Sequence, residues 1–124
     1  LSTAGCVVWV EDESLMDVVT AVSGSGPAYF FRMAEALTAA GVEQGLPPAA
    51  ANELAIATLH GAGLMATRGA DLAALRESVT SKGGTTAAAL AEFTAQGLEQ
   101  TVSAAVAAAV SRGRQMATQY GTGS

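Results

Sequence analysis

Apolar residues recur every three or four positions along most of this chain, which is the spacing that places them on one face of an α-helix. The pattern predicts six helices, at about residues 12–22, 28–44, 48–68, 71–79, 86–95 and 98–118. The clearest apolar stripes are Phe30, Met33, Leu37 and Ala40, then Leu54, Ala57, Gly61 and Leu64, and finally Val102, Val106 and Val110. Residues 1–10 are apolar and strand-like, as expected of the end of an element that begins earlier in a longer protein.

Glycine and proline mark the ends of these helices. Pro27 suits a first helical turn, where its missing N–H costs nothing, so SGSGP at residues 23–27 is predicted to separate the first two helices. Asp71 can accept a hydrogen bond from a first-turn N–H and cap the fourth helix. Helix-ending glycines are expected at Gly45, Gly69 and Gly97. The sequence therefore predicts an all-α bundle of about six helices in a single domain, residues 1–124.

Composition narrows the class of protein. Half of the residues are apolar but only 5% are aromatic, so small side chains dominate and favour closely packed helices. The net charge is −5 and the six basic residues are scattered, which argues against a nucleic-acid surface. The single cysteine cannot form an internal disulfide and fits a reducing compartment. Without a leader-like segment or an apolar run of roughly 20 residues, we expect a soluble, cytoplasmic protein with no membrane partner.

The segment SGSGPAY, residues 23–29, allows two interpretations. Its two glycines could belong to a dinucleotide-binding turn. Tyr29, however, stands where that fingerprint needs a third glycine or an alanine, and no acidic residue follows a second strand. The alternative is a junction between two helices that needs unusual backbone angles. The spacing favours the junction.

The segment SKGGTT, residues 81–86, stands directly in front of a predicted helix. Its glycines let the backbone approach a ligand closely. The N–H groups of Gly84, Thr85 and Thr86 would lie at the helix start, where first-turn donors lack partners. A small carboxylate suits such a place, and Lys82 could attract it. The alternative is a well-capped loop, in which a threonine caps its own helix and Lys82 is merely solvated.

The remaining candidate groups indicate little chemistry. His60 has no Cys, Asp or Glu at ligand spacing, so no metal site is predicted. Cys6 is expected to act as a small hydrophobic residue rather than a reactive thiol. Neither a Ser–His–Asp arrangement nor a pair of catalytic carboxylates can be argued for. The residues alone thus offer one anion-binding loop and no catalytic base.

Three long segments resemble the C-terminal half of the pyrroline-5-carboxylate reductase family. They are SGSGPAYFF with the following helix that ends in GVEQGLPPAAA, the signature-like ESVTSKGGTTAAALAEF, and GLEQTVSAAVAAAVSRGRQM, which is similar to the family's last helix. The resemblance runs from Leu1 to about Met116, with the motifs in the family's order. It implies part of an oxidoreductase that reduces 1-pyrroline-5-carboxylate to L-proline with NAD(P)H.

The resemblance also implies an architecture. Family members join an N-terminal Rossmann domain, which binds the dinucleotide, to a helical C-terminal domain of the 6-phosphogluconate-dehydrogenase C-terminal-like type. Two helical domains interleave into a homodimer, and dimers can assemble further. This chain would be the helical domain alone, so no cofactor and no turnover are expected of it by itself. The choice between NADPH and NADH would lie outside these residues.

The site residues are carried over by motif. Those implied to bind substrate are Val79, Ser81, Gly83, Gly84, Thr85 and Thr86. Among them Thr86 is the candidate catalytic residue, beside the imine nitrogen, Val79 is a candidate wall, and the others hold the substrate carboxylate. The substrate would lie between the nicotinamide of one subunit and this loop of its partner. The family pattern leads us to expect proline at the Lys82 position, where lysine adds a charge and removes a constraint.

Two alternatives remain. The chain could be a stand-alone helical dimerisation or scaffold module that keeps the fold without the chemistry. It could also be the helical domain of another dehydrogenase that pairs a Rossmann domain with a helical one. Binding of proline or a ring-carboxylate analogue would separate the first alternative from the reductase.

Overall fold

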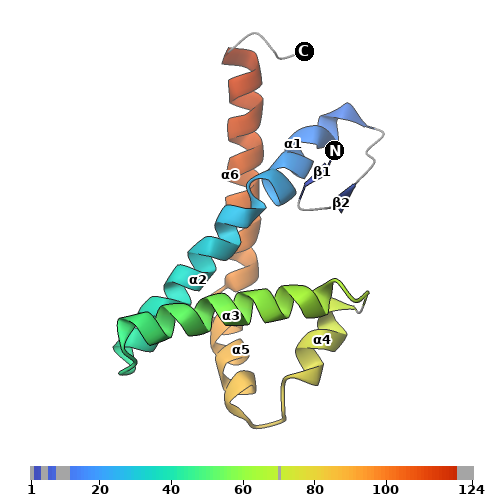
Figure 1. Ribbon diagram of the computed structural model, residues 1–124. Coiled ribbons are helices and arrows are strands. Elements are labelled where there is room, and N and C mark those ends of the chain that lie inside the picture. Colours follow the sequence, from blue (N-terminus) through green and yellow to red (C-terminus); the bar gives the residue numbers. More distant parts are fainter. Residues whose placement is uncertain (1, 4–5, 8–11, 70, 120–124) are drawn as a thin grey trace. The chain divides into compact units, whose positions relative to one another are not determined.

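The computed structural model describes residues 2–3, 6–7, 12–69 and 71–119 of the 124-residue chain. Figure 1 follows the elements in order. They are β1 (Ser2–Thr3), β2 (Cys6–Val7), a 3₁₀ turn (Glu13–Leu15), α1 (Met16–Val19), a π-helical turn (Thr20–Gly24), α2 (Gly26–Glu43), α3 (Pro48–Ala66), α4 (Leu72–Ser78), α5 (Thr85–Ala95) and α6 (Leu98–Gln119). The predicted helical class is confirmed, and the described strands are one antiparallel pair, β1 with β2.

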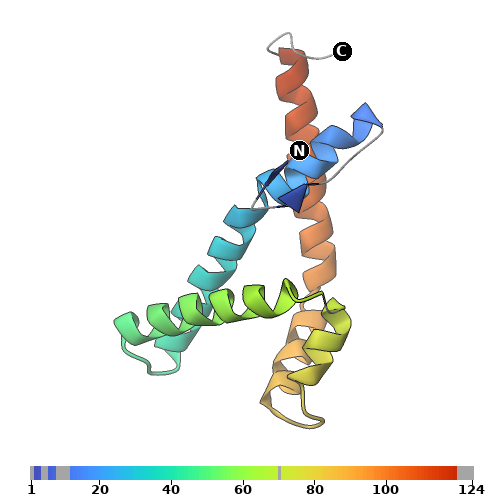
Figure 2. The same ribbon diagram turned by 45° about the vertical axis from the view of Figure 1, so that its right-hand side comes forward.

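The chain divides into two compact units, residues 1–29 with 97–124 and residues 30–96. In the first unit, α1 packs against α6 (Figure 2). A Cβ added at Gly113 on α6 would lie 3.0 Å from Oδ1 of Asp17, so glycine allows the two helices to approach closely. Nε of Arg114 lies 3.8 Å from Oδ2 of Asp17. Because both side chains are partly exposed, this ion pair contributes little to stability.

The junction between α1 and α2 is a widened helical turn. The backbone N–H of Ser25 donates to the carbonyl oxygen of Thr20, five residues earlier, at 2.8 Å. The Tyr29 hydroxyl donates to the carbonyl oxygen of Ala21 at 2.6 Å. Ala21 itself is only 1% exposed. Neither glycine of SGSGP has a positive φ. The expectation of unusual backbone angles at this junction is therefore wrong, because the wide turn accommodates the change of path instead.

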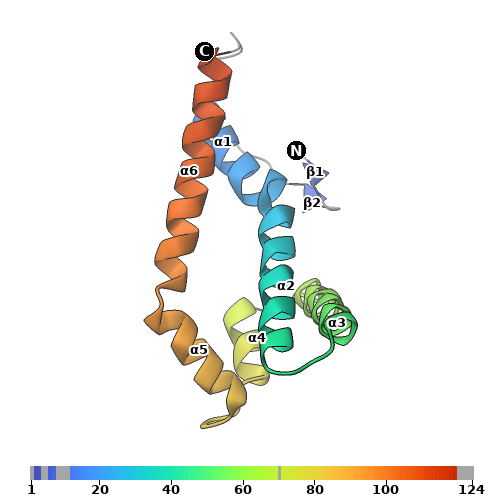
Figure 3. The ribbon, with the colours of Figure 1, turned by 90° about the vertical axis from the view of Figure 1, so that its left-hand side faces the viewer.

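The second unit is organised around a hairpin of α2 and α3 (Figure 3). Gly45 has a φ of +111°, and the N–H of Leu46 donates to the carbonyl oxygen of Gly41 at 3.0 Å, which ends α2. A Cβ added at Gly41 would lie 3.2 Å from Cδ1 of Leu46 and 3.4 Å from Cβ of Ala51. Ala51 and Ala55 are buried. Small residues thus let the start of α3 come close to the end of α2 at their connection.

Large apolar side chains on these helices stay exposed. The buried apolar residues in the described part of the chain are all alanines, namely Ala21, Ala51 and Ala55. Exposed large apolar residues include Phe30, Phe31, Met33, Leu37, Leu54, Ile56, Leu64 and Val102. On α3, Leu54 and Leu64 are 56% and 48% exposed. The apolar stripes predicted from the sequence are therefore present, but much of their surface is not covered by the single chain.

The predicted helix ends are confirmed to within a few residues. Gly69 and Gly97 have φ values of +82° and +78° just after helices, as expected of helix-ending glycines. Oδ2 of Asp71 accepts a hydrogen bond from the backbone N–H of Ala74 at 3.1 Å, which is the predicted cap of α4. None of the described helices is both long enough and apolar enough to cross a membrane.

Candidate functional site

The candidate site is the loop between α4 and α5, which lies entirely within the second unit (Figure 1). Its departure from α4 is fixed by hydrogen bonds to the last carbonyls of that helix. The hydroxyl of Thr80 donates to the carbonyl oxygen of Arg76 at 2.6 Å, and its N–H donates to the carbonyl oxygen of Glu77 at 3.1 Å. The N–H of Val79 also donates to Arg76, at 3.3 Å. Because these carbonyls would otherwise lack partners, the bonds hold the chain where Ser81 begins the next turn.

Residues Ser81–Gly84 form a tight turn. The N–H of Gly84 donates to the carbonyl oxygen of Ser81 at 3.0 Å, and Gly83 has a φ of +75°. This combination matches a type II turn, which requires a positive φ at its third residue and therefore favours glycine there. Lys82 occupies the second position, where proline is commonly found. The turn thus keeps its form with lysine at a position where the family pattern leads us to expect proline.

Gly84 is the residue from which α5 starts. Its backbone is extended, with a φ of −90° and a ψ of −173°, and its carbonyl oxygen accepts a hydrogen bond from the N–H of Ala88 at 3.2 Å. A Cβ added here would collide with Oγ of Ser81, so glycine keeps the turn closely packed. Its N–H is used within the turn. The expectation that this N–H is available to an anion is therefore wrong.

The start of α5 has no side-chain cap. Thr85 and Thr86 are the first two residues of the helix, and the N-cap position is held by Gly84. The alternative in which a threonine caps its own helix is therefore wrong. The N–H groups of Thr85, Thr86 and Ala87 precede the first helical hydrogen bond, and no acceptor for them lies among the residues that the structure describes.

The threonine hydroxyls at this helix start differ from those farther along helices. The hydroxyl of Thr94 donates to the carbonyl of Leu90, four residues earlier in α5, at 3.1 Å. Thr85 and Thr86 have no preceding helical turn, and within the described residues no partner accepts from their hydroxyls. These two hydroxyls thus remain able to donate to, or accept from, a bound molecule.

The loop is open and locally free of acidic side chains. Val79, Ser81, Lys82, Gly83 and Thr85 are exposed, whereas Gly84 and Thr86 are half-buried. Residues 78–91 contain no Asp or Glu. The first turn of an eleven-residue helix adds partial positive charge. All six predicted site residues therefore lie in one continuous segment that suits a small carboxylate, with a threonine hydroxyl beside it.

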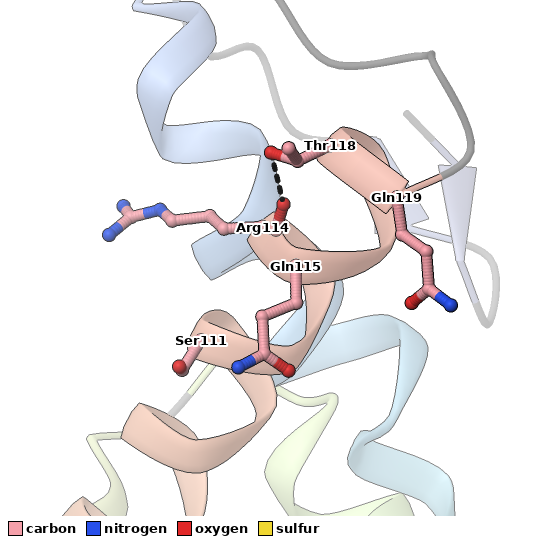
Figure 4. A pocket seen from close by; sticks show the side chains of 5 residues that line it. All are labelled: Ser111, Arg114, Gln115, Thr118 and Gln119. Carbon is pink, nitrogen blue, oxygen red and sulfur yellow. Dashed lines mark hydrogen bonds between the residues drawn. The ribbon is translucent and has the colours of Figure 1, made fainter.

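A depression on α6 is a second candidate, in the first unit. It is lined by Ser111, Arg114, Gln115, Thr118 and Gln119, and the hydroxyl of Thr118 donates to the carbonyl oxygen of Arg114 at 3.2 Å (Figure 4). No motif or apolar stripe in the sequence indicates this face. All of its residues come from one helix, and its one cation is beside Asp17. It is therefore a weaker candidate than the α4–α5 loop.

The other residues considered from sequence add no site. His60 lies exposed on α3, and Cys6 lies in β2. The part of the chain that the structure describes has no group of three or more His, Cys, Asp or Glu side chains that could hold a metal ion. SGSGP follows a helical turn rather than a strand, so it lacks the strand that precedes a dinucleotide-binding turn.

The amino-acid sequence is similar to those of known reductases. Residues 13–116 match a family model described as pyrroline-5-carboxylate reductase dimerisation. The pyrroline-5-carboxylate reductase of Haemophilus influenzae is 48% identical over 122 residues, which cover 97% of this chain and 45% of the relative. The chain thus spans a little under half the length of this relative.

Solved structures agree in fold. A pyrroline-5-carboxylate reductase from Coxiella burnetii is 38% identical with a TM-score of 0.85, over 90% of this chain and 42% of that one. The pyrroline carboxylate reductase of Plasmodium falciparum, solved with NADP bound, is 34% identical with a TM-score of 0.79, over 85% of this chain and 40% of that one. The family match covers most of the sequence, including the α4–α5 loop. The chain therefore belongs to the pyrroline-5-carboxylate reductase dimerisation family.

Proposed function

We propose that this chain is the dimerisation and substrate-binding domain of a pyrroline-5-carboxylate reductase, which reduces 1-pyrroline-5-carboxylate to L-proline with NAD(P)H. The observation that carries the proposal is the start of α5. There the first-turn N–H groups and the hydroxyls of Thr85 and Thr86 have no partners among the described residues, directly behind a glycine turn. Membership in the reductase family supports the assignment of this anion-binding start to the substrate carboxylate.

Different residues of the loop would contact different parts of the substrate. Ser81, Gly83, Gly84 and Thr85 surround the place for the carboxylate, with glycines that allow the backbone to come close. Val79, which is 59% exposed, offers an apolar wall for the ring. The Thr86 hydroxyl would lie beside the imine nitrogen. A fixed carboxylate and a polar group at nitrogen orient the ring, so positioning supplies much of the catalysis.

The dinucleotide would be held mainly outside these residues. The described part of the chain contains no glycine-rich turn between a strand and a helix, which is the element that binds the pyrophosphate in a Rossmann domain. The Plasmodium falciparum relative was solved with NADP bound, and this chain covers 40% of it. When bound, NAD(P)H supplies the hydride. The residues of this chain then bind and orient the molecule that receives it.

The exposed apolar faces would be covered by a second copy of the chain. Leu54 and Leu64 on α3 and Val102 on α6 are each about half exposed, and the buried apolar residues among those described are all alanines. Such incomplete burial of large apolar side chains is unusual for a folded monomer of this size. A homodimer would bury these faces. The family's description as a dimerisation domain supports this part of the proposal. The assembly of such dimers and the cytoplasmic location stay predictions.

A reductase assay tests the proposal. A polypeptide that carries this chain at its relatives' full length should oxidise NAD(P)H only when 1-pyrroline-5-carboxylate is added, and it should bind proline. A folded, full-length protein that binds the dinucleotide but neither turns over nor binds proline would contradict the proposal. That outcome would favour a scaffold module that keeps the fold alone.

A further inference from the structure

Lys82 is the one lysine of the chain, and it stands in the candidate site. Its side chain is exposed at the second position of the Ser81–Gly84 turn. Within the described residues it makes no ion pair, whereas Nη1 of Arg32, in the same unit, lies 3.8 Å from Oε1 of Glu35. Residues 30–96 carry six acidic and four basic side chains, so this unit as a whole repels anions. Lys82 is therefore a free cation in an acidic unit.

The position of Lys82 in the chain puts its charge near the start of α5. Two peptide units separate it from Gly84, so their Cα atoms are at most about 7.6 Å apart. Gly83 between them has no side chain, and outside Lys82, Gly83 and Gly84 themselves no atom lies within 4 Å of where its Cβ would be. The flexible lysine stem can thus bring its ammonium group in front of the first-turn N–H groups. The Cα separation of Lys82 and Gly84 is itself within about one screening length at physiological salt, which is ~8 Å.

We propose that Lys82 is a positioning residue that draws the carboxylate of the substrate to the start of α5 and raises the affinity for it. The inference rests on the proposed reductase function and adds a residue to that site. An exposed charge that attracts the carboxylate acts on the bound substrate and on the transition state alike. Its removal should therefore raise KM for the carboxylate substrate and leave kcat unchanged.

Steady-state kinetics of the full-length protein with 1-pyrroline-5-carboxylate test this role. At low ionic strength, Lys82→Gln should raise KM for that substrate by about two- to fivefold, as expected of one charge acting through water over several ångströms. Lys82→Arg, which keeps the charge, should stay close to wild type. At roughly 0.5 M salt the difference between wild type and Lys82→Gln should largely disappear.

Arg68→Gln is the matched control. It removes the same charge from the same unit, but Arg68 precedes α4 and Lys82 follows it, so the seven residues of that helix lie between them (Figure 1). The KM of Arg68→Gln for 1-pyrroline-5-carboxylate should change less than half as much as that of Lys82→Gln. An unchanged KM in Lys82→Gln, a change that falls on the dinucleotide instead, or an effect that persists at high salt would each overturn the inference. Absence of reductase activity in the wild type would overturn the proposed function itself, and with it the role proposed for Lys82.

Discussion

The backbone N–H of Gly84 donates a hydrogen bond to the carbonyl oxygen of Ser81, with the two atoms 3.0 Å apart. This bond closes the turn in front of α5, and the next three N–H groups of the chain have no acceptor among the described residues. The site proposed here depends on this bond, because it sets where the uncapped end of α5 begins.

Gly83→Ala should destabilise the protein. Gly83 has a φ of +75°, which an alanine adopts only at a cost of about 1 kcal/mol, although no neighbouring atom obstructs the added methyl group. Chemical denaturation would measure the loss. Gly63→Ala is the control, because Gly63 lies inside α3 with open space around it and should lose nothing from backbone strain. Equal stability in wild type and Gly83→Ala would contradict the turn described for Ser81–Gly84.

Lys82→Pro should have the opposite effect. Proline is favoured at the second position of a type II turn, and the N–H of Lys82 donates no hydrogen bond within the described residues. The substitution should raise the free energy of unfolding by about 0.4–1 kcal/mol, since it restricts the unfolded chain. The same denaturation experiment measures it. A clear loss of stability would show that residue 82 does not have the backbone angles of this turn.

The first helical turn should depend on pH through Asp12. The backbone N–H and then the hydroxyl of Ser14 donate to Oδ1 of Asp12, at 3.0 and 2.8 Å, and these bonds lower the pKa of the carboxyl below its ordinary value of 3.8. Because the pKa of Asp12 is lowered in the folded protein, its ionised carboxylate stabilises the fold above about pH 4. This stabilisation is lost as pH falls through the folded-state pKa.

NMR titration of the Ser14 amide measures this dependence. The amide shift should follow a pKa below that of Asp12 in a short peptide of the same sequence. Asp12→Asn should remove the transition from the titration curve. Equal pKa values in the protein and the peptide would contradict the capping bonds at Asp12.

The apolar face of α3 should hold two copies of the chain together. Leu54→Glu places a charge on a face where the leucine is 56% exposed, so it should leave the folded chain intact and weaken the dimer. Burying a leucine contributes about 1.5–3 kcal/mol, so the dissociation constant should rise by roughly tenfold or more. Sedimentation measures this change. Asn52→Glu adds the same charge at an exposed polar residue of the same helix, as the control for charge alone.

Two sedimentation results would contradict this dimer interface. A wild-type chain that sediments as a stable, folded monomer at micromolar concentration would show that the exposed leucine and valine faces need no partner. A dimer that Leu54→Glu and Asn52→Glu weaken equally would place the interface on other residues.

Much of the fold follows from local rules that a sequence displays. Helix spacing, the glycines after helices and the Asp71 cap depend on neighbouring residues, so they could be predicted. The wide turn at Thr20–Gly24 could not be predicted, because one extra residue in a turn barely alters the apolar pattern. The alternative with a threonine cap could not be dismissed from the sequence, because Thr85 and Thr86 both suit an N-cap by type. In the structure the Ser81–Gly84 turn gives that position to Gly84.

The sequence could predict which segment forms the candidate site, but not which of its N–H groups are available to bind an anion. Two glycines and two threonines before a helix indicate an anion site from sequence alone. Which N–H groups remain available depends on the turn that precedes the helix. The bond from Gly84 to Ser81 removes one donor from the expected set, and α5 begins with Thr85.

The most direct test of the account is the rate of NAD(P)H oxidation by full-length Thr86→Ala with 1-pyrroline-5-carboxylate, beside Thr94→Ala. Both substitutions remove a threonine hydroxyl from α5, but that of Thr94 donates to its own helix. We predict that Thr86→Ala lowers kcat/KM by about a hundredfold, as loss of a placed donor does, and that Thr86→Ser largely restores it. Thr94→Ala should stay close to wild type. Equal activity in the wild type and Thr86→Ala would contradict the central claim that the start of α5 holds the substrate.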